Sequence, residues 1–430
     1  MLFVPVTRPE SLQHIPDQVD GVEYRLDYNL GLKDHKCSKP VLFTVRSVGH
    51  GGKFQRAEQE ALIEQVAALK PDYLDLEYDM RPAFLQKKRH SKIVLSYHNF
   101  QETPDLEPIY HAMSKYPAHT YKIACLARST NDALRMLLFA KSHDKVSVIP
   151  MGEYGEFARI LGPVVGNIID FASLDEATAP GQLSVQDLET YRYRSLNPKT
   201  ALYGLIGDPI DRSQGHIYHN DLFAKRGINA VYVKMVVKEL PEFFRLARQL
   251  GFCGLSVTMP LKEKVMPFLD EVDPKALQIG AVNTIVGMKG YNTDGVGALD
   301  AIGDVKDKRV VLLGAGGAAR AIAFEAKARG SHVTILNRTV EKARDLAKAV
   351  GCNYGPLTEV PSHYDILVNC SPDPMPIDPE QILPTARVMD IVYVPRETEF
   401  LRAAASRGCK VIYGEQMFWN QAAAQTKLWF

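Results

Sequence analysis

Short β-rich runs recur along the first half of this chain at intervals of roughly twenty residues. Several segments between them carry apolar residues at three- and four-residue spacing, which is typical of amphipathic helices. Strands that alternate with helices in this number predict a compact (β/α)8 barrel, although some connections are too short for a full helix. The eight runs lie at residues 2–6, 21–28, 41–47, 73–79, 92–99, 120–127, 145–151 and 167–173.

The sequence changes character near Asn197, where a polar segment containing Asn-Pro precedes a new strand-like run. We place a domain boundary there. Further strand-like runs follow at 201–207, 230–237, 254–260 and 281–287, and residues 309–339 have the pattern of a nucleotide-binding βαβ unit. The chain is therefore predicted to be α/β throughout, with a barrel followed by a second α/β part.

Charge and cysteine usage narrow the classes of partner. The 51 basic and 50 acidic residues leave a net charge of +1, which gives no electrostatic case for nucleic acid or an anionic membrane. No apolar run reaches the length of a membrane span. The six cysteines lie far apart without metal-like spacing, so we expect free thiols, no metal and a cytoplasmic location. A small molecule is the expected ligand, and the oligomeric state stays open.

Polar side chains gather near the carboxyl ends of the predicted barrel strands, where barrels of this class carry their chemistry. Those on the second to sixth strands are Glu23, Arg25, Asp27, Arg46, Glu77, His98 and Lys122. Arg25 and Arg46, with Arg159 from a later loop, could grip the carboxylate of an anionic substrate. A solvated cluster of salt bridges is the alternative interpretation.

Lys122 lies within TYKIACLA, a segment that otherwise has the composition of a buried strand. Desolvation and nearby arginines disfavour an ammonium, so we predict a largely neutral amine that can attack a ketone and form a Schiff base. A lysine that extends outward to solvent from a strand end is the alternative. His98, one strand earlier, suits general acid–base catalysis, and Glu77 could orient its imidazole.

A family resemblance strengthens this interpretation. The segments EYRLD, TVRS, LDLEYD, SYHNF, YKIA, FARI and TAPGQ, in this order, resemble type I 3-dehydroquinate dehydratases over residues 1–195. The resemblance implies that Lys122 forms an imine with 3-dehydroquinate, that His98 moves the protons and that Glu77 supports His98. The substrate contacts that it implies are Glu23, Arg25, Arg46, Arg159, Thr178 and Gln182.

A glycine-rich segment lies in the second half. The sequence GAGGAA at 314–319 fits G-x-G-x-x-G/A directly after a predicted strand and at the start of a helix. The backbone can approach a pyrophosphate there, although a tight turn without a ligand is the alternative. About twenty residues on, Asn337, Arg338 and Thr339 stand where an NAD site usually has an acidic residue, so the predicted cofactor is NADP.

Two segments upstream carry a candidate proton donor and its relay. GLSVTMPLKEKV contains Thr258 and Lys262 just beyond a strand, and GYNTDGVG contains Asn292 and Asp294. A lysine and an aspartate near a nicotinamide can supply the proton that accompanies hydride transfer to a carbonyl. By itself, Lys262 would more often be a solvated lysine at a helix start.

A second resemblance covers residues 200–430. GLIGDPIDRS, SVTMPLK, GAVNT, GYNTDG, GAGGAAR, NRT, DIVYVPRET and GEQMFWNQAA resemble shikimate dehydrogenases. The resemblance implies a substrate-binding domain at 200–298, completed by about 412–430, and a Rossmann domain at 299–411 that binds NADP. Lys262 and Asp294 would be the catalytic pair. The implied substrate contacts are Ser213, Thr258, Asn283, Tyr393 and Gln421, and the implied cofactor contacts are Gly314, Ala315, Gly316, Gly317, Ala318, Asn337, Arg338 and Thr339.

Three positions depart from the second pattern. Gly215 and His216 in RSQGH replace an expected serine and proline, and Ser256 replaces a common asparagine. We expect activity to be retained with changed substrate affinity. Together the halves predict a bifunctional enzyme that makes 3-dehydroshikimate and reduces it with NADPH to shikimate. A quinate-using dehydrogenase and a non-catalytic NADP-sensing module are the alternatives for the second half.

Overall fold

The computed structural model describes residues 1–430 and contains three β-sheets, one of eight strands and two of six. By its internal packing the chain divides into two compact units, residues 1–204 with 220–252 and residues 205–219 with 253–430. The three predicted domains follow the sheets instead of these units, and they remain a proposal. No helix has both the length and the apolar composition that crossing a bilayer requires.

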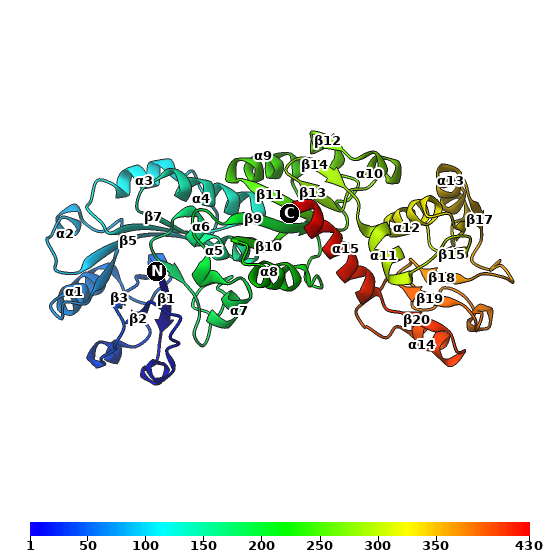
Figure 1. Ribbon diagram of the computed structural model, residues 1–430. Helices are drawn as coiled ribbons and strands as arrows, with labels where there is room; N and C mark the ends of the chain where they lie inside the picture. The colour runs from blue at the N-terminus through cyan, green and yellow to red at the C-terminus, as the bar shows by residue number, and fades with distance from the viewer. The chain divides into compact units, whose positions relative to one another are not determined.

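The first sheet is a nearly closed parallel barrel with the strand order β7-β6-β5-β4-β3-β2-β1-β8 (Figure 1). All eight predicted strands form, which confirms the α/β barrel. The strands are β1 (Leu2–Val6), β2 (Gly21–Arg25), β3 (Val41–Thr44), β4 (Tyr73–Glu77), β5 (Lys92–Asn99), β6 (Thr120–Leu126), β7 (Val146–Met151) and β8 (Asp170–Phe171). Inward-pointing side chains fill the barrel, and its core cluster includes Phe3, Leu42, Tyr73, Val94, Ala124, Ile149 and Phe171.

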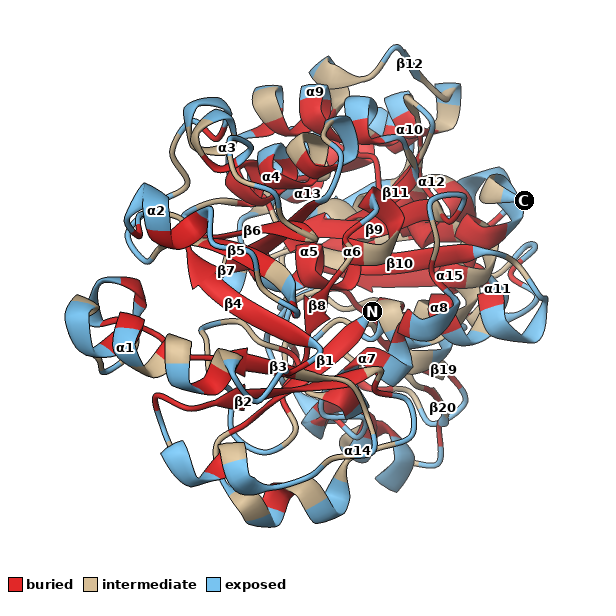
Figure 2. Cartoon of the chain, turned by 90° about the vertical axis from the view of Figure 1, so that its left-hand side faces the viewer, coloured by how far each residue is buried: buried red, intermediate tan, exposed pale blue.

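Helices cover the barrel only in part, because the first two connections contain 3-10 turns, η1 (Pro9–His14) and η2 (Leu30–Asp34). The later connections contain η3 (Val48–His50), α1 (Arg56–Ala67), α2 (Pro82–Leu85), α3 (Glu107–Met113), α4 (Thr130–Ser142), η4 (Glu153–Gly155), α5 (Glu156–Ile160), α6 (Gly162–Val165), α7 (Val185–Thr190) and η5 (Tyr193–Ser195). Figure 2 shows buried strands beneath helices whose outer faces are exposed.

Side chains join β7 to β8, where the barrel lacks a backbone ladder. The amide of Asn167 bonds both backbone groups of Val148, accepting from its N–H at 3.1 Å and donating to its carbonyl at 3.0 Å. The Ser147 hydroxyl accepts from the N–H groups of Ile168 and Ile169. Because β8 is only two residues long, these bonds satisfy backbone groups that a longer strand would have paired.

We predict that Asn167→Ala loosens this seam. Two buried backbone groups of Val148 would lose their partners, which costs about 2–4 kcal/mol in total. Hydrogen–deuterium exchange of the peptide that contains β7 measures the change, and we expect exchange to accelerate there. Asn353→Ala, which alters an exposed asparagine of the third sheet, is the control. Unchanged exchange at Val148 in Asn167→Ala would contradict this account of closure.

The second sheet is mixed and has the order β10-β9-β11-β13-β14-β12. Strand β13 runs antiparallel to both of its neighbours. Its elements are β9 (Ala201–Gly207), β10 (Ala230–Val236), β11 (Phe252–Val257), β12 (Glu271–Val272), β13 (Thr284–Val286) and β14 (Lys289–Tyr291), with the helices α8 (Gly215–Lys225), α9 (Leu240–Leu250), η6 (Met266–Phe268) and α10 (Pro274–Ile279).

The third sheet is parallel throughout and has the order β17-β16-β15-β18-β19-β20, which is the order of a dinucleotide-binding fold. Its strands are β15 (Arg309–Leu313), β16 (His332–Leu336), β17 (Asn353–Gly355), β18 (Ile366–Asn369), β19 (Arg387–Asp390) and β20 (Lys410–Ile412). The accompanying helices are α11 (Asp294–Ile302), α12 (Gly317–Ala328), α13 (Val340–Val350), η7 (Pro379–Gln381) and α14 (Glu399–Ser406).

The last helix, α15 (Gly414–Trp429), packs along α11 and returns to the second sheet. Its Trp429 indole donates to the carbonyl of Ile285, and its Gln425 amide donates to the carbonyl of Asn283. These bonds attach the end of α15 to β13 and to Asn283, and the completion of the second domain by residues 412–430 stays a prediction.

Candidate active sites

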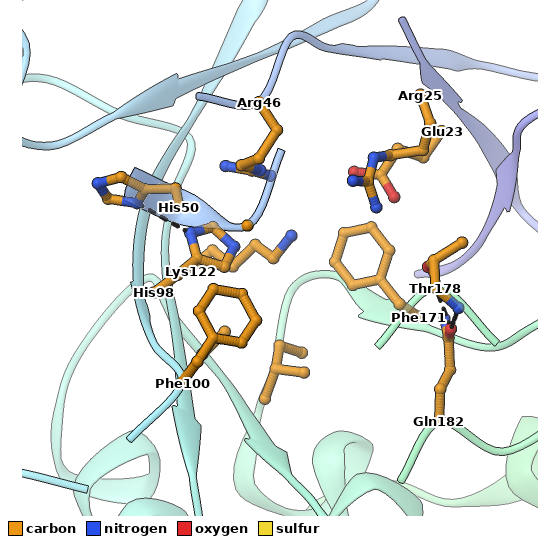
Figure 3. A pocket seen from close by; sticks show the side chains of 13 residues that line it. Glu23, Arg25, Arg46, His50, His98, Phe100, Lys122, Phe171, Thr178 and Gln182 are labelled. Carbon is orange, nitrogen blue, oxygen red and sulfur yellow. Dashed lines mark hydrogen bonds between the residues drawn. The ribbon is translucent and has the colours of Figure 1, made fainter. Parts of the chain in front are cut away.

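A pocket opens at the mouth of the barrel and is lined by charged side chains from several strands (Figure 3). Alternation along the pleat directs side chains of one parity inward, and parallel strands bring their carboxyl ends to the same rim. Seven of the nine residues that the sequence assigned to the first site line this pocket. They are Glu23, Arg25, Arg46, His98, Lys122, Thr178 and Gln182.

Lys122 lies on β6 with only 7% of its surface exposed. Its Nζ is 4.0 Å from Asp75 Oδ2 and 4.2 Å from the centre of the Phe171 ring. Burial lowers the pKa of Lys122 to about 8, with Arg46 and Arg25 adding to the effect while Glu23 and Asp75 oppose it. The pKa of Lys122 is therefore lowered, as the sequence predicts, but the amine is not largely neutral at pH 7. A pKa near 8 leaves roughly a tenth of the amine neutral at pH 7.

Asp75 is a carboxylate that faces two buried cations, Arg46 and Lys122, and it is not among the residues predicted from the sequence. It accepts from both terminal nitrogens of Arg46 at 2.9 Å and from the Ser96 hydroxyl at 2.7 Å. Burial opposes its ionisation, but Arg46 and Lys122 hold the pKa of Asp75 below its usual range. Its spacing of two from Glu77 on one strand was the available signal, because alternate residues share a face.

Arg25 and Glu23 lie side by side on β2 and each has a fixed partner. The Arg25 guanidinium donates twice to Asp27, at 2.9 and 2.7 Å, and Glu23 accepts from the Thr44 hydroxyl at 2.7 Å. Such bonds restrict both side chains to one orientation before any ligand arrives. The pocket therefore presents oriented cations together with a carboxylate, which suits a polyhydroxylated anion.

The loop at residues 178–182 borders the pocket. Thr178 donates to Gln182 Oε1 from its N–H at 2.8 Å and from its hydroxyl at 3.2 Å. Arg159 does not line the pocket, because its guanidinium donates to the carbonyls of Pro150 and Pro180, each at 3.0 Å. Arg159 thus anchors this loop to β7, and a direct substrate contact from Arg159 stays a prediction.

His98 contacts a second histidine that the sequence argument did not consider. His98 Nδ1 is 3.2 Å from His50 Nδ1, and Figure 3 marks this contact. Burial and the neighbouring cations lower the pKa of His98 well below its usual value, so the ring is neutral near pH 7. Glu77 does not touch His98. Instead it accepts from the N–H and hydroxyl of Ser47 and from Arg56.

In the second half, Lys262 and Asp294 form a direct ion pair of 2.5 Å. The Asn283 amide donates to Asp294 Oδ1 at 2.8 Å and to Gln421 Oε1 at 3.4 Å. Asp294 is the first residue of α11, so the N–H groups of that helix start lie close to its carboxylate. Four of the predicted dehydrogenase residues therefore meet, although they come from four separate segments.

The other predicted substrate contacts of this half have partners of their own. The Tyr393 hydroxyl donates to the Arg212 carbonyl at 3.4 Å, and Ser213 Oγ accepts from the Gly215 N–H at 3.3 Å. The Thr258 N–H donates to the Ile206 carbonyl. None of these bonds joins Ser213, Thr258 or Tyr393 to the Lys262–Asp294 pair.

The glycine-rich turn fits a bound pyrophosphate. It follows β15 and begins α12, a helix of 12 residues whose N-cap Gly316 offers no side chain to the free N–H groups. A Cβ added to Gly316 or Gly317 would meet nothing within 4 Å, so packing inside the protein does not require glycine there. Open space before an uncapped helix start is what a phosphate needs. Arg338, beyond β16, is exposed and makes no ion pair.

Comparisons with known proteins agree with both family resemblances. A family model for type I 3-dehydroquinase matches residues 7–197, one for the shikimate dehydrogenase substrate binding domain matches 205–285, and one for shikimate/quinate 5-dehydrogenase matches 297–399. A chloroplastic bifunctional 3-dehydroquinate dehydratase/shikimate dehydrogenase from Arabidopsis thaliana is 34% identical over 95% of this chain and 77% of its own length. The shikimate biosynthesis protein AroDE of Chlamydia pneumoniae is 35% identical over 96% and 90%.

The chain belongs to the bifunctional 3-dehydroquinate dehydratase/shikimate dehydrogenase family. Two solved shikimate dehydrogenases resemble the second half. One, in complex with NADP+, is 40% identical over 54% of this chain and 91% of its own, with a TM-score of 0.53. The other, from Thermus thermophilus with NADP(H) and shikimate, is 34% identical over 54% and 93%, with a TM-score of 0.51.

The burial of Lys122 in the dehydratase barrel predicts an unusual pH dependence. Only the neutral amine reacts with electrophiles, so acylation of Lys122 should rise about tenfold per pH unit below about pH 8 and level off above it. Brief labelling with acetic anhydride and mass spectrometry measures this, with exposed Lys348 as the reference for reagent reactivity. Labelling of Lys122 that still rises tenfold per unit above about pH 9 would contradict the lowered pKa.

Proposed function

We propose that the barrel dehydrates 3-dehydroquinate to 3-dehydroshikimate through an imine on Lys122, and that the second half reduces this product to shikimate with NADPH. The main support for the first step is the buried amine of Lys122. It shares a pocket with the neutral imidazole of His98 and with two arginines, Arg25 and Arg46. Family membership supports the pairing of the two activities. The product of the first step is a ketone, which is what the second step reduces.

The imine step uses the depressed pKa of Lys122. The neutral amine adds to the substrate ketone, and loss of one water leaves a C=N bond to Nζ. Burial lowers the pKa of this lysine, so its neutral fraction at a given pH is larger than that of a lysine in water. Hydrolysis of the imine after dehydration restores both the ketone and Lys122.

His98 is proposed to move both protons of the dehydration. As a base it removes a proton from the carbon next to the C=N bond, and the electron pair forms an enamine with Lys122. The protonated ring then gives its proton to the departing hydroxyl, which leaves as water. The lowered pKa of His98 supports the neutral resting ring that the first of these transfers needs. Glu77 is proposed to act on His98 only through other side chains.

Substrate binding is proposed to depend on the oriented cations. Arg25 and Arg46 would receive the substrate carboxylate, and Glu23 would accept from its hydroxyls. Thr178 and Gln182 would close the pocket, and Arg159 would hold their loop or contact the substrate itself. Asp75, which pairs with Arg46 and Lys122, keeps both cations oriented between turnovers.

In the second half, Lys262 and Asp294 are proposed as the catalytic pair, with Asn283 orienting the carboxylate. Lys262 would give a proton to the carbonyl oxygen as a hydride arrives at the carbon. Ser213, Thr258, Tyr393 and Gln421 are proposed to bind the substrate. Bound NADPH would supply the hydride, and the residues proposed to hold it are Gly314, Ala315, Gly316, Gly317, Ala318, Asn337, Arg338 and Thr339.

The preference for NADP over NAD is proposed to depend on Arg338 and Thr339. Arg338 has no ion-pair partner in the protein and stands beyond β16, where the 2′ position of a bound adenosine ribose is expected. No acidic residue occupies residues 337–339 to bond a free ribose hydroxyl. The partners proposed for the whole chain are small molecules. The proposed location of the protein is the cytoplasm.

Trapping of the imine tests the dehydratase proposal. Borohydride added during turnover of 3-dehydroquinate should attach the reduced substrate to Lys122, and peptide mass mapping locates it. Lys122→Met should abolish dehydratase activity, because no amine remains to form the C=N bond, while the dehydrogenase activity of the same chain is retained. Mass attached at any other residue would refute the role of Lys122.

Replacement of Arg338 tests the cofactor proposal. Arg338→Ala should lower kcat/KM for NADPH by about tenfold, equivalent to about 1.4 kcal/mol, because a charged hydrogen bond to the 2′-phosphate is lost. The value for NADH should change little. Steady-state reduction of 3-dehydroshikimate with each reduced cofactor measures this. Oxidation of shikimate and of quinate with NADP+ and with NAD+ compares the two alcohol substrates. An equal loss with NADH would contradict the assignment, and turnover of quinate equal to that of shikimate would favour a quinate dehydrogenase.

A further inference from the structure

The His98 imidazole is bonded to another imidazole and not to a carboxylate. The two Nδ1 atoms are 3.2 Å apart, and the ring planes meet at 81°. His50 belongs to η3 and His98 to β5, so the pair joins two neighbouring segments of the barrel rim. Both rings line the pocket, and Figure 3 shows His98 between His50 and the amine of Lys122.

Two Nδ1 atoms at this separation can share only one proton. A hydrogen bond needs one donor and one acceptor, and an imidazole nitrogen cannot serve as both at once. If one ring carries a proton on Nδ1, the Nδ1 of the other ring must be unprotonated so that it can accept the hydrogen bond. The tautomer of His98 is therefore decided by His50.

Asp79 determines which ring nitrogen of His50 carries the proton. His50 Nε2 is 3.2 Å from Asp79 Oδ1, whereas the nearest oxygen of Glu77 is 3.9 Å away. Arg56 donates to both oxygens of Asp79 at 2.7 Å. Burial opposes ionisation of Asp79, but the bonds from His50 and Arg56 hold its pKa below the usual range. An ionised carboxylate only accepts, so His50 Nε2 must carry a proton.

We propose that Asp79 and His50 are positioning residues that fix the ring tautomer of His98. A neutral His50 with its proton on Nε2 accepts at Nδ1, so His98 donates from its own Nδ1. His98 Nε2, on the side of the ring away from His50, is then left without a proton and can take one from the substrate. This inference rests on the proposed function of the barrel and specifies how its base is prepared.

The bond to Asp79 excludes the opposite arrangement of the pair. If His50 donated from Nδ1, a neutral His98 would have to accept there and carry its own proton on Nε2. That form of His98 cannot accept a proton from the substrate. The charged and titratable groups around the pair are Arg25, Arg46 and Lys122 beside His98, and Glu77, Tyr78, Asp79 and Arg56 beside His50.

Two substitutions of similar size separate a hydrogen-bonding role from a packing role. In His50→Asn the amide oxygen occupies the position of Nδ1 and can accept from His98, whereas His50→Leu fills the space without an acceptor. We expect His50→Leu to lower dehydratase kcat by about 10²-fold with little change in KM, which is within the range for a misplaced general base. His50→Asn should keep kcat within about tenfold of the wild type, because the acceptor for His98 is retained. The dehydrogenase activity of each variant monitors folding, and His111→Gln, at an exposed histidine, is the matched control.

The tautomer is measured directly by long-range ¹H–¹⁵N correlation of the histidine rings in the resting protein, with His98→Gln identifying the His98 signals. The wild type should show His98 protonated on Nδ1, and Asp79→Ala should shift His98 toward the Nε2-protonated form. A wild-type His98 protonated on Nε2 near pH 8, or a dehydratase kcat in His50→Leu equal to the wild type, would overturn the proposal. Borohydride trapping on Lys122 does not depend on this tautomer, so loss of trapping identifies failure of the proposed function instead.

Discussion

A single buried carboxylate makes the barrel site possible. Asp75 pairs with Arg46 at 2.9 Å and lies 4.0 Å from Lys122, so one carboxylate reduces the repulsion between two buried cations. Burial alone would lower the pKa of Lys122, and Asp75 and Glu23 limit that fall, so the pKa is about 8. The amine is thus reactive near neutral pH and still stable within the barrel. The orientation of Arg46, and with it one side of the substrate pocket, depends on the same bond.

The two halves place a lysine and a carboxylate in different geometries, and different roles are proposed for the two lysines. Lys262 and Asp294 are in direct contact at 2.5 Å, and Lys262 is the group proposed to give up a proton. Lys122 Nζ lies 4.0 Å from Asp75 Oδ2, and burial lowers its pKa to about 8, so its neutral fraction is larger than that of a lysine in water. The arrangement of Lys262 suits a proton donor, and that of Lys122 suits a nucleophile. Asn283 ties the first arrangement to α15, so the last helix of the chain contributes to the second site.

Much of the fold and part of the candidate barrel site could be predicted from the sequence, because the sequence patterns that indicate them are local. The alternation of strands and helices predicted the barrel, and the glycine turn with its following helix predicted the third sheet. Lys122 was identifiable because a lysine within an apolar strand is unusual. The partner of His98 was not identifiable in this way. Glu77 lies on the neighbouring strand and has the usual chemistry, but the 3-10 turn η3 brings His50 to the imidazole instead.

Strand and helix order, family membership and the candidate site residues whose chemistry is rare in a core could all be predicted from the sequence. The contacts that act across strands came from the folded structure. It brought Asp75 to Lys122, turned Arg159 toward backbone carbonyls, and closed the barrel between β7 and β8 through the side chain of Asn167. Such contacts form only when atoms of residues far apart in the chain come within a few tenths of an ångström of the required separation. Periodicity and composition contain no information about such distances.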